Sequence, residues 1–243
     1  MKISVCIPMY NESAVIENTA RTLWQYMTAN FGSGNFEIIF SDDGSRDACG
    51  NIVRSLSLPD VRVVGYEKNR GKGYAVRTAF LAAEGDIVMF TDADLAYGTD
   101  VIERVCRTFD ANPDADLLIG SRNISKDGYE GYTFLRKIMS KTYIKILCLV
   151  GGFKLSDSQC GCKAFRREAV QKIFPRCEVD GFAFDFEAIL WANKYGMKII
   201  EMPVKVINSG ESKVNIVKDT LKMLSDLAKM KKRISKEKIE KNQ

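Results

Sequence analysis

The strongest constraint on the fold of this chain is the alternation of short apolar runs with amphipathic segments over its first half. Five runs have the length and composition of buried strands, and helical patterns separate them. This alternation is typical of a mostly parallel sheet with helices on both faces, so we predict an α/β fold. The expected strands cover 2–7, 36–40, 61–66, 86–91 and 115–120, and the expected helices cover 12–27, 46–56, 74–83 and 99–112.

The second half of the chain is less regular. Its pattern predicts helices over 133–150 and 182–195, and one or two strands over 197–206. In the second of these helices, Phe182 and its aromatic neighbours at 184 and 186 are expected in the core rather than at a lipid surface.

Positive charge is concentrated at the C-terminal end. Residues 213–243 hold ten Lys/Arg and four Asp/Glu, a net +6 against +5 for the whole chain, so residues 1–212 carry a net charge of −1. We therefore expect a domain over 1–212 and a basic amphipathic helix or tail over 213–243. The tail fits a helix that docks on the domain or one that lies on an anionic membrane. Its lack of interleaved aromatics argues against nucleic acid.

The chain contains no histidine, which excludes Ser-His-Asp triads, Cys-His dyads and HExxH zinc sites. The seven cysteines lack the spacing of a four-ligand zinc site. Without a recognisable signal peptide, they indicate reduced thiols in a cytoplasmic protein. No stretch of about 18 uncharged apolar residues occurs, so no membrane-spanning helix is expected.

Polar turns follow the predicted strands, at the edge where parallel sheets bind ligands. The first turn holds Tyr10, Asn11 and Glu12, and it lacks the glycine patterns of dinucleotide and P-loop sites. An aromatic ring, an amide and a carboxylate suit a nucleoside. A structural role is also open, in which Asn11 caps the next helix and Glu12 favours its dipole.

The second and third turns carry acidic and basic groups, respectively. Asp42 and Asp43 suit a base or a ribose, and with Ser45 they equally suit a turn and a helix cap. Two glycines flank Lys72 at the start of a predicted helix. Backbone N–H groups, the lysine and the helix dipole there favour a phosphate.

The fourth turn is the sharpest signal. The apolar strand 86–91 runs into Asp92 and Asp94. On an extended chain these side chains point the same way, roughly 7 Å apart. Two buried like charges are costly unless a cation neutralises them. A divalent metal shared with a diphosphate would do so, and the sequence therefore predicts a metal–diphosphate site.

In order and spacing, these turns resemble a GT-A glycosyltransferase of the large inverting family that uses nucleotide-diphosphate sugars. Later stretches extend the resemblance to the branch that glycosylates polyprenyl phosphates, the dolichyl-phosphate glucosyltransferases and mannosyl synthases. Those stretches are 120–122, 157–163, 182–187 and 210–213. The resemblance covers about residues 1–220. It implies a Rossmann-like nucleotide-binding half and an acceptor half, with 1–212 as the catalytic domain.

The resemblance implies a role for each matching residue. The nucleotide would be bound by Pro8, Tyr10, Glu12, Asp42, Asp43, Lys72 and Asp92. Mg²⁺ or Mn²⁺ would be bound by Asp94, the more direct ligand, and Asp92. The acceptor phosphate would be held by Arg122, Arg136 and Ser140. The sugar and diphosphate would be surrounded by Gln159, Asp185, Glu187 and Lys213.

Ala96 stands where the mannosyl synthases tend to have Gln, which favours UDP-glucose or a related UDP-sugar as the donor. The acceptor phosphate is already an anion, so its attack needs little proton removal and the absence of histidine is no handicap. The expected partners are a nucleotide-diphosphate sugar and a polyprenyl phosphate at the cytoplasmic face of a membrane, with oligomer formation left open.

Two alternatives remain from the sequence. The same fold could transfer the sugar to a glycan or another hydroxyl, with Asp185 as the base. More remotely, Asp-x-Asp also occurs in haloacid dehalogenase-like phosphohydrolases. In those enzymes, however, the pair follows the first strand, whereas here it follows the fourth.

Overall fold

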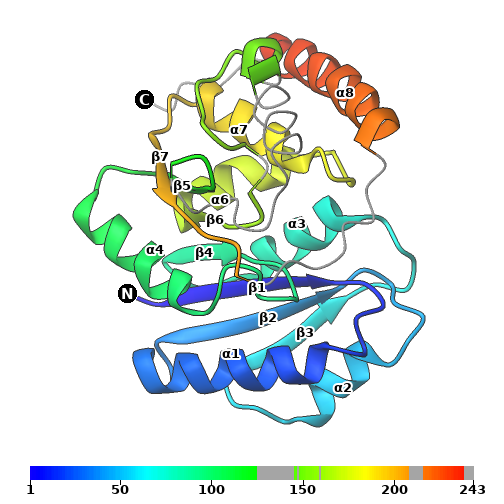
Figure 1. Ribbon diagram of the computed structural model, residues 1–243, viewed down its shortest axis with the longest axis vertical. Coiled ribbons are helices and arrows are strands. Elements are labelled where there is room, and N and C mark those ends of the chain that lie inside the picture. Colours follow the sequence, from blue (N-terminus) through cyan, green and yellow to red (C-terminus); the bar gives the residue numbers. More distant parts are fainter. Residues whose placement is uncertain (125–144, 147, 159, 208–215, 238–243) are drawn as a thin grey trace.

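The computed structural model describes residues 1–124, 145–146, 148–158, 160–207 and 216–237. Within these ranges a seven-stranded sheet lies between two layers of helices (Figure 1). The strands are β1 (Ile3–Met9), β2 (Phe36–Asp42), β3 (Val61–Gly65), β4 (Ile87–Phe90), β5 (Leu117–Ser121), β6 (Lys163–Arg166) and β7 (Ile199–Pro203). The helices are α1 (Ile16–Phe31), α2 (Cys49–Ser55), α3 (Lys72–Ala82), α4 (Asp100–Ala111), α6 (Arg167–Ile173), the 3-10 helix η1 (Phe174–Arg176), α7 (Phe184–Lys194) and α8 (Ile216–Lys236).

The strand order is β3-β2-β1-β4-β6-β5-β7. β3, β2, β1 and β4 run parallel, and β7 runs parallel to β5. β6 is antiparallel to both of its neighbours, β4 and β5. The predicted mostly parallel sheet is therefore confirmed, with one reversed strand that links its two halves.

The strand β6 and the helix α6 are absent from the sequence-based prediction. β6 has four residues, and a charged side chain stands at each of its ends, Lys163 and Arg166. Because neither a hydrophobic alternation nor a long apolar run marks it, its pairing partners alone define it as a strand. α6 begins at the next residue, so no turn signal separates the two elements.

Each face of the sheet has its own hydrophobic core. In β1, Val5 and Ile7 point to the cluster that contains α1, α2 and α4, whereas Cys6 points to the cluster that contains α3, α6 and α7. This alternation follows from the two-residue period of a strand. Both faces are covered, which accounts for the nearly continuous burial of the central strands.

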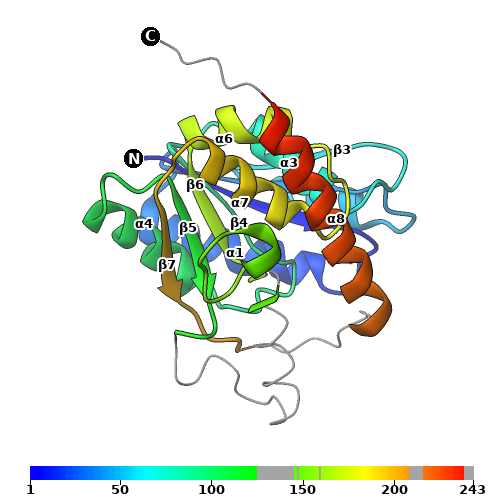
Figure 2. The same cartoon turned by 90° about the horizontal axis from the view of Figure 1, so that it is seen from above.

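α8 packs beside α7 on the second face, as Figures 1 and 2 both show. Leu227, Met230 and Ile234 of α8 are buried in the same cluster as α7, at spacings of three and four residues. The sequence leaves open whether this helix docks on the domain or lies on a membrane. The structure shows that its C-terminal half docks on the domain. None of the helices in the described ranges combines the length and hydropathy needed to span a bilayer.

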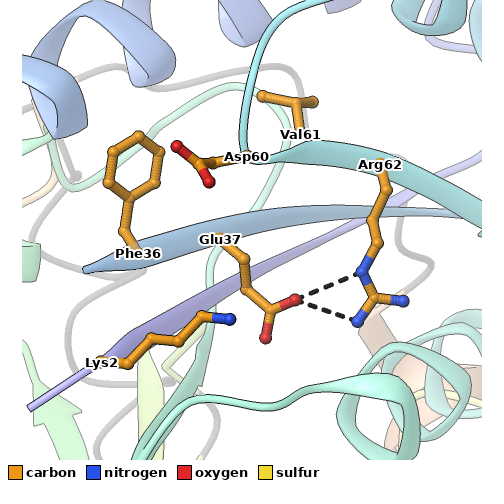
Figure 3. Close-up of a pocket in the computed structure, with 6 residues that line it drawn as sticks. All are labelled: Lys2, Phe36, Glu37, Asp60, Val61 and Arg62. Atoms are coloured by element: carbon orange, nitrogen blue, oxygen red, sulfur yellow. Dashed lines mark hydrogen bonds and ion pairs between the residues drawn. The ribbon is translucent and has the colours of Figure 1, made fainter. Parts of the chain in front are cut away.

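A pocket opens at the edge of the sheet where β2 and β3 begin (Figure 3). It contains the buried Glu37, whose carboxylate accepts hydrogen bonds from Ser4 Oγ at 2.6 Å and from Arg62 at 3.0 and 3.2 Å. These bonds lower the pKa of Glu37 although its burial acts in the opposite direction. The predicted site lies at the opposite ends of these strands, so we interpret this pocket as structural.

Candidate active site

The polar turns meet at one edge of the sheet because the strands before them are parallel neighbours. Met9 at the end of β1 lies opposite Asp42 of β2, and Cys6 lies opposite Phe90 at the end of β4. The antiparallel β6 begins at this same edge, since Lys163 pairs with Phe90. The polar turns therefore lie together at the carboxyl ends of the strands, where the site is expected from the sequence.

Asp92 lies between a lysine and a glycine. Its Oδ1 is 2.5 Å from Lys72 Nζ, and a Cβ atom added to Gly161 would lie 2.4 Å from its Oδ2. The carboxylate of Asp92 thus occupies the space that a side chain at position 161 would need. The side chain of Lys72 is one quarter exposed. Burial disfavours its charge, but the carboxylates of Asp92, Asp185 and Asp94 outweigh this effect and raise the pKa of Lys72.

Asp94 has a different environment from Asp92. β4 ends at Phe90, and Leu95 N donates to Asp92 O at 3.0 Å, so residues 92–95 form a turn. The extended-chain argument for two parallel, buried carboxylates is therefore wrong, and Asp94 is exposed. Its Oδ1 accepts a hydrogen bond from Ala96 N at 3.0 Å. Partial desolvation, followed by the neighbouring Asp92 charge, raises the pKa of Asp94.

Lys163 is a second cation at this edge. Its side chain is 1% exposed, and its Nζ lies 2.9 Å from Asp185 Oδ1 and donates to Cys160 O at 2.7 Å. The Nζ atoms of Lys72 and Lys163 are each 5.8 Å from the centre of the Phe90 ring. Burial raises the pKa of Asp185, and the charge of Lys163 opposes that rise. The sequence does not single out Lys163, because no apolar run or alternation marks the residues around it as a buried strand.

The first two turns, after β1 and β2, form one unit. Asn11 adopts a φ of 56°, its Oδ1 accepts a hydrogen bond from Arg46 N at 2.8 Å, and its own N–H donates to Ser45 Oγ at 3.1 Å. α1 begins at Ile16, and neither α1 nor α2 has a side-chain cap. The proposed capping roles of Asn11 and Ser45 are therefore wrong, because both side chains tie the two turns together instead.

The same pair of turns is joined by Asp47, which accepts hydrogen bonds from Ser13 N at 2.9 Å and Cys49 N at 3.0 Å. Desolvation acts against these bonds, but they prevail and lower the pKa of Asp47 to about 2. Tyr10 is 40% exposed at the end of β1. Pro8 and Glu12 are half-buried on either side of it, so the three residues predicted to hold the nucleoside lie together.

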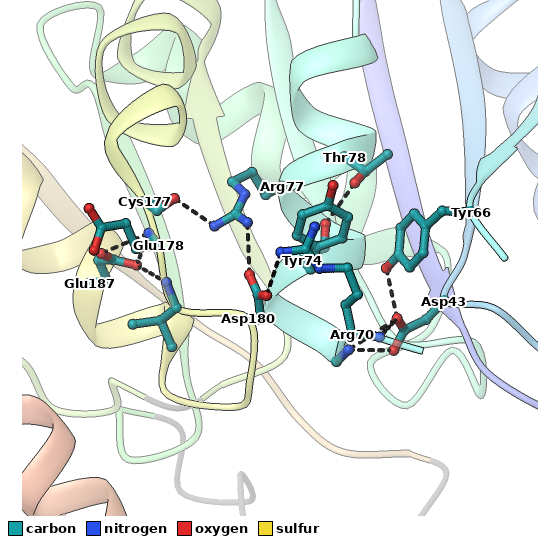
Figure 4. Close-up of polar contacts among 12 residues, drawn as sticks. Asp43, Tyr66, Arg70, Tyr74, Arg77, Thr78, Cys177, Glu178, Asp180 and Glu187 are labelled. Carbon is teal, nitrogen blue, oxygen red and sulfur yellow. Dashed lines mark hydrogen bonds and ion pairs between the residues drawn. The ribbon is translucent and has the colours of Figure 1, made fainter. Parts of the chain in front are cut away.

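Asp42 and Asp43 are adjacent but have different partners. Asp43 is 4% exposed and accepts hydrogen bonds from Tyr66 Oη at 2.7 Å and from the N–H groups of Arg70 and Gly71 at 2.8 and 2.9 Å; Figure 4 shows Asp43 beside Tyr66 and Arg70. It also accepts a hydrogen bond from Asn69 Nδ2 at 2.8 Å. It therefore anchors the loop before Lys72. Asp42 is half-buried and its Oδ1 accepts one hydrogen bond from Ser45 N at 2.9 Å. Of the two carboxylates, Asp42 is the more accessible.

Arg122 follows β5 on the other side of the site. It pairs with the fully buried Asp157, with Nε–Oδ2 at 2.6 Å and Nη2–Oδ1 at 3.1 Å. Although burial disfavours the guanidinium charge, the bonds to Asp157 raise the pKa of Arg122. Asp157 N in turn donates to Glu201 of β7 at 3.2 Å. The arginine is thus held as a fixed cation just beyond the end of β5.

The hydrogen-bond and ion-pair partners of Glu187 are in the segment before α7 and in α8. Its carboxylate is fully buried and accepts hydrogen bonds from the N–H groups of Glu178 and Val179, and it also pairs with Arg233 of α8. Phe182 is 64% exposed, so the expectation that it lies in the core is wrong. Four further predicted residues, Arg136, Ser140, Gln159 and Lys213, lie outside the described residues.

Hard oxygen ligands are available for a metal at Asp92 and Asp94. No cluster of three or more His, Cys, Asp or Glu with metal-binding geometry occurs within the described ranges. Two carboxylates nevertheless fit Mg²⁺, which usually takes one or two protein carboxylates and completes its shell with substrate phosphates and water. The residues present therefore fit a metal that arrives with a diphosphate.

A match to a protein-family model shows to which family this chain belongs. The model described as Glycosyl transferase family 2 matches residues 4–174. The chain belongs to glycosyl transferase family 2. The match includes all four polar turns, Arg122 and Lys163. Membership of this family excludes the haloacid dehalogenase-like alternative.

Several curated family members resemble the chain over nearly its whole length. Glycosyltransferase AglD of Haloferax volcanii is 32% identical over 233 residues, which cover 93% of this chain and 36% of AglD. The dolichyl-phosphate beta-glucosyltransferase of Saccharomyces cerevisiae is 30% identical over 243 residues, covering 93% of this chain and 72% of the yeast protein. The human protein of that name is 28% identical over 241 residues, with 93% and 74% covered. The chain thus spans about a third of AglD and nearly three quarters of the other two.

Solved structures confirm the GT-A fold. Glucosyl-3-phosphoglycerate synthase from Mycobacterium tuberculosis, in complex with Mn²⁺, UDP and glucosyl-3-phosphoglycerate, has a TM-score of 0.70 at 18% identity, covering 98% of this chain and 81% of that one. The same synthase in complex with Mg²⁺ and UDP has a TM-score of 0.67 at 18% identity, with 94% and 79% covered. The family 2 chain therefore has the expected GT-A fold, with a mostly parallel sheet flanked by helices.

Proposed function

We propose that this family 2 chain transfers glucose, with inversion, from UDP-glucose to a polyprenyl phosphate such as dolichyl phosphate. The observation that carries the proposal is the group formed by Lys72, Asp92 and Asp94 at the carboxyl end of β4. The names of the similar dolichyl-phosphate beta-glucosyltransferases support the choice of sugar and acceptor. Ala96 supports a UDP-sugar over GDP-mannose.

On the donor side, the uridine would contact Pro8, Tyr10, Glu12 and Asp42. The exposed Tyr10 ring offers a stacking surface, and Asp42 retains acceptor capacity for a base or ribose. Asp43 would act indirectly, because its bonds hold the loop that carries Lys72. Lys72 would neutralise negative charge on the departing diphosphate, which is greatest in the transition state.

Asp94, together with Asp92, would hold Mg²⁺ or Mn²⁺. When bound, this metal supplies positive charge beside the diphosphate. The exposed position of Asp94 supports its role as the more direct ligand, since a ligand that enters from solvent can reach it. Asp92 already forms an ion pair with Lys72, so its negative charge is less available to a metal.

On the acceptor side, Arg122 would orient the phosphate of the lipid, together with Arg136 and Ser140. Arginine suits a phosphate because its donors form a planar fork. The acceptor oxygen is already anionic, so attack needs no general base. Asp185, fixed by Lys163, would then hold sugar hydroxyls, with Gln159 nearby and Lys213 over the diphosphate.

A peripheral position at the cytoplasmic face of a membrane belongs to the same proposal. Leu149 and Ile146 are 82% and 41% exposed. Lys231 of α8 donates to Val150 O at 2.9 Å, which joins this apolar surface to the basic helix, where the side chain of Lys229 is 76% exposed. Apolar and basic groups together favour an anionic lipid surface. We further propose that residues 1–212 form the catalytic domain and 213–243 its basic helical appendage.

The decisive experiment incubates the purified protein with radiolabelled UDP-glucose and Mn²⁺. One reaction contains polyprenyl phosphate and a second contains an oligosaccharide. We expect label in the lipid product alone; label in the oligosaccharide alone would refute the lipid acceptor and favour a hydroxyl acceptor with Asp185 as base. Asp94→Ala should abolish transfer while the fold survives, whereas Asp110→Ala, at an exposed carboxylate of α4, should retain it.

A further inference from the structure

The loop 177–183 connects η1 to α7 and lies against the start of α3, which carries Lys72. A Cβ atom added to Gly71 would lie 2.6 Å from Asp180 O, and one added to Gly73 would lie 2.6 Å from Val179 O. The two glycines that flank Lys72 therefore allow the backbone of this loop to contact the backbone of α3. Gly71 is also required by its φ of 112°, a region that other residues avoid.

Side chains of α3 and of the segment just before it fix the loop in this position. Arg70 Nη2 and Arg77 Nη2 donate to the two oxygens of Asp180 at 2.9 and 2.8 Å, and Arg77 Nη1 donates to Cys177 O at 2.6 Å (Figure 4). Tyr74 N donates to Asp180 O at 3.1 Å. The guanidinium of Arg70 stacks 3.6 Å from the centre of the Tyr74 ring. Lys72 therefore has a fixed place relative to this loop.

The other end of the loop is fixed by Glu187. Its carboxylate accepts hydrogen bonds from Glu178 N at 3.0 Å and Val179 N at 2.8 Å, and its side chain has no exposure to solvent. A buried carboxylate is costly without a cation. That cation is Arg233 of α8, which contacts both Glu187 and Glu178. The loop then leads directly into α7, whose second residue is Asp185.

We propose that Arg233 is a positioning residue for the transferase reaction: through Glu187 and the loop 177–183, it sets the positions of Lys72 and Asp185. α8 is then part of the machinery that aligns the leaving diphosphate and the sugar. This inference rests on the proposed function, because Lys72 and Asp185 matter to turnover only if that function is correct.

The packing of α7 against α8 also supplies a matched control. Lys194, the last residue of α7, donates through its Nζ to the carbonyl oxygens of Ile234 and Glu237 at the end of α8, and neither of these groups belongs to the loop 177–183. Arg233→Met and Lys194→Met each remove one cationic contact between α7 and α8. Both variants should weaken docking of the helix, but Arg233→Met alone should disturb the loop.

The test compares the kinetics and the amide exchange of the full chain. We expect Arg233→Met to lower kcat for glucose transfer roughly tenfold, with KM for UDP-glucose changed less than about threefold, since misplaced groups affect the transition state most. Arg233→Lys should restore kcat to within about threefold of wild type, because its charge still neutralises Glu187. Lys194→Met should keep kcat within about twofold, because the groups it contacts lie outside the loop.

Amide exchange tests the same chain of contacts without turnover. The N–H groups of Glu178, Val179 and Tyr74 should exchange at least about tenfold faster in Arg233→Met than in Lys194→Met, since local opening sets these rates. A wild-type kcat in Arg233→Met, an equal loss in Lys194→Met, or unchanged exchange at Tyr74 would overturn the inference. If the wild-type protein transfers no glucose, the proposed function fails. The amide exchange of Tyr74 then still tests whether Arg233 positions the loop and α3.

Discussion

Gly161→Ala tests whether the place of Asp92 governs the reaction. The added methyl group would lie 2.4 Å from Asp92 Oδ2, whereas an ordinary contact begins near 3.4 Å, so one of the two groups must move by about 1 Å. Gly161 N donates to Tyr97 Oη at 3.0 Å, and Tyr97 is buried, which holds the backbone of Gly161 in place. The carboxylate of Asp92 must therefore move, and its 2.5 Å contact with Lys72 should be lost.

The expected effect follows from that displacement. A shift of about 1 Å in an aligned catalytic group costs on the order of 100-fold in rate, or about 2.7 kcal/mol in the activation barrier. The cost in stability should be small, because Gly161 does not have a positive φ and alanine fits its backbone. Overpacking by one methyl group should cost about 1 kcal/mol, which lowers Tm by about 2–4 °C for a domain of this size.

The assay measures initial rates of glucose transfer to polyprenyl phosphate at saturating Mn²⁺, with Tm measured on the same preparations. Gly181→Ala is the matched control, since a Cβ atom at Gly181 would have no atom within 4 Å. If Gly161→Ala retains kcat within about threefold of wild type, the reasoning that links this contact to catalysis is refuted.

Three further predictions concern stability. Arg62→Met leaves the buried Glu37 without its cation and should lower the free energy of unfolding by about 2 kcal/mol in urea denaturation, with kcat per folded molecule unchanged. Asp47→Ala should cost about 1 kcal/mol at pH 7. Because the pKa of Asp47 is lowered to about 2 in the folded protein from 3.8, this stabilisation is complete above about pH 4 and is lost as pH falls through about 2, so urea midpoints of wild type and variant should converge there; a constant difference would contradict the assignment. Tyr66→Phe removes one hydrogen bond to Asp43 and should cost about 1 kcal/mol, measured by the shift in Tm, and an unchanged Tm would count against an anchoring role for Asp43.

The sequence predicts those parts of the fold that depend on local pattern. The strands before the polar turns follow from apolar runs, and their shared edge follows from parallel pairing. The sequence therefore predicts that Lys72 and Asp92, twenty residues apart, lie at one edge of the sheet, but it does not predict their direct contact. β6 is not predicted either, because its four residues carry charge at both ends and find their place by pairing on both sides.

Site chemistry was harder to predict where two similar residues stand side by side. A pair of carboxylates at 42 and 43 gives no indication of which one faces the loop, and the structure assigns that part to Asp43. At Asp92, the sequence leads to a metal as the neutralising charge, whereas the described structure also supplies Lys72. The pairing of Glu187 with Arg233 spans 46 residues, and no local periodicity encodes it.

The reversed strand β6 has a consequence for how substrates reach each other. It is hydrogen-bonded to β4, which leads to the turn with Asp92 and Asp94, and to β5, which leads to Arg122. A hinge that opened the donor half away from the acceptor half would have to break this ladder, at about 1 kcal/mol for each backbone bond. In the proposed reaction, the sheet therefore fixes the distance between the departing diphosphate and the attacking phosphate. Any gating of the reaction must act through the turns above that edge.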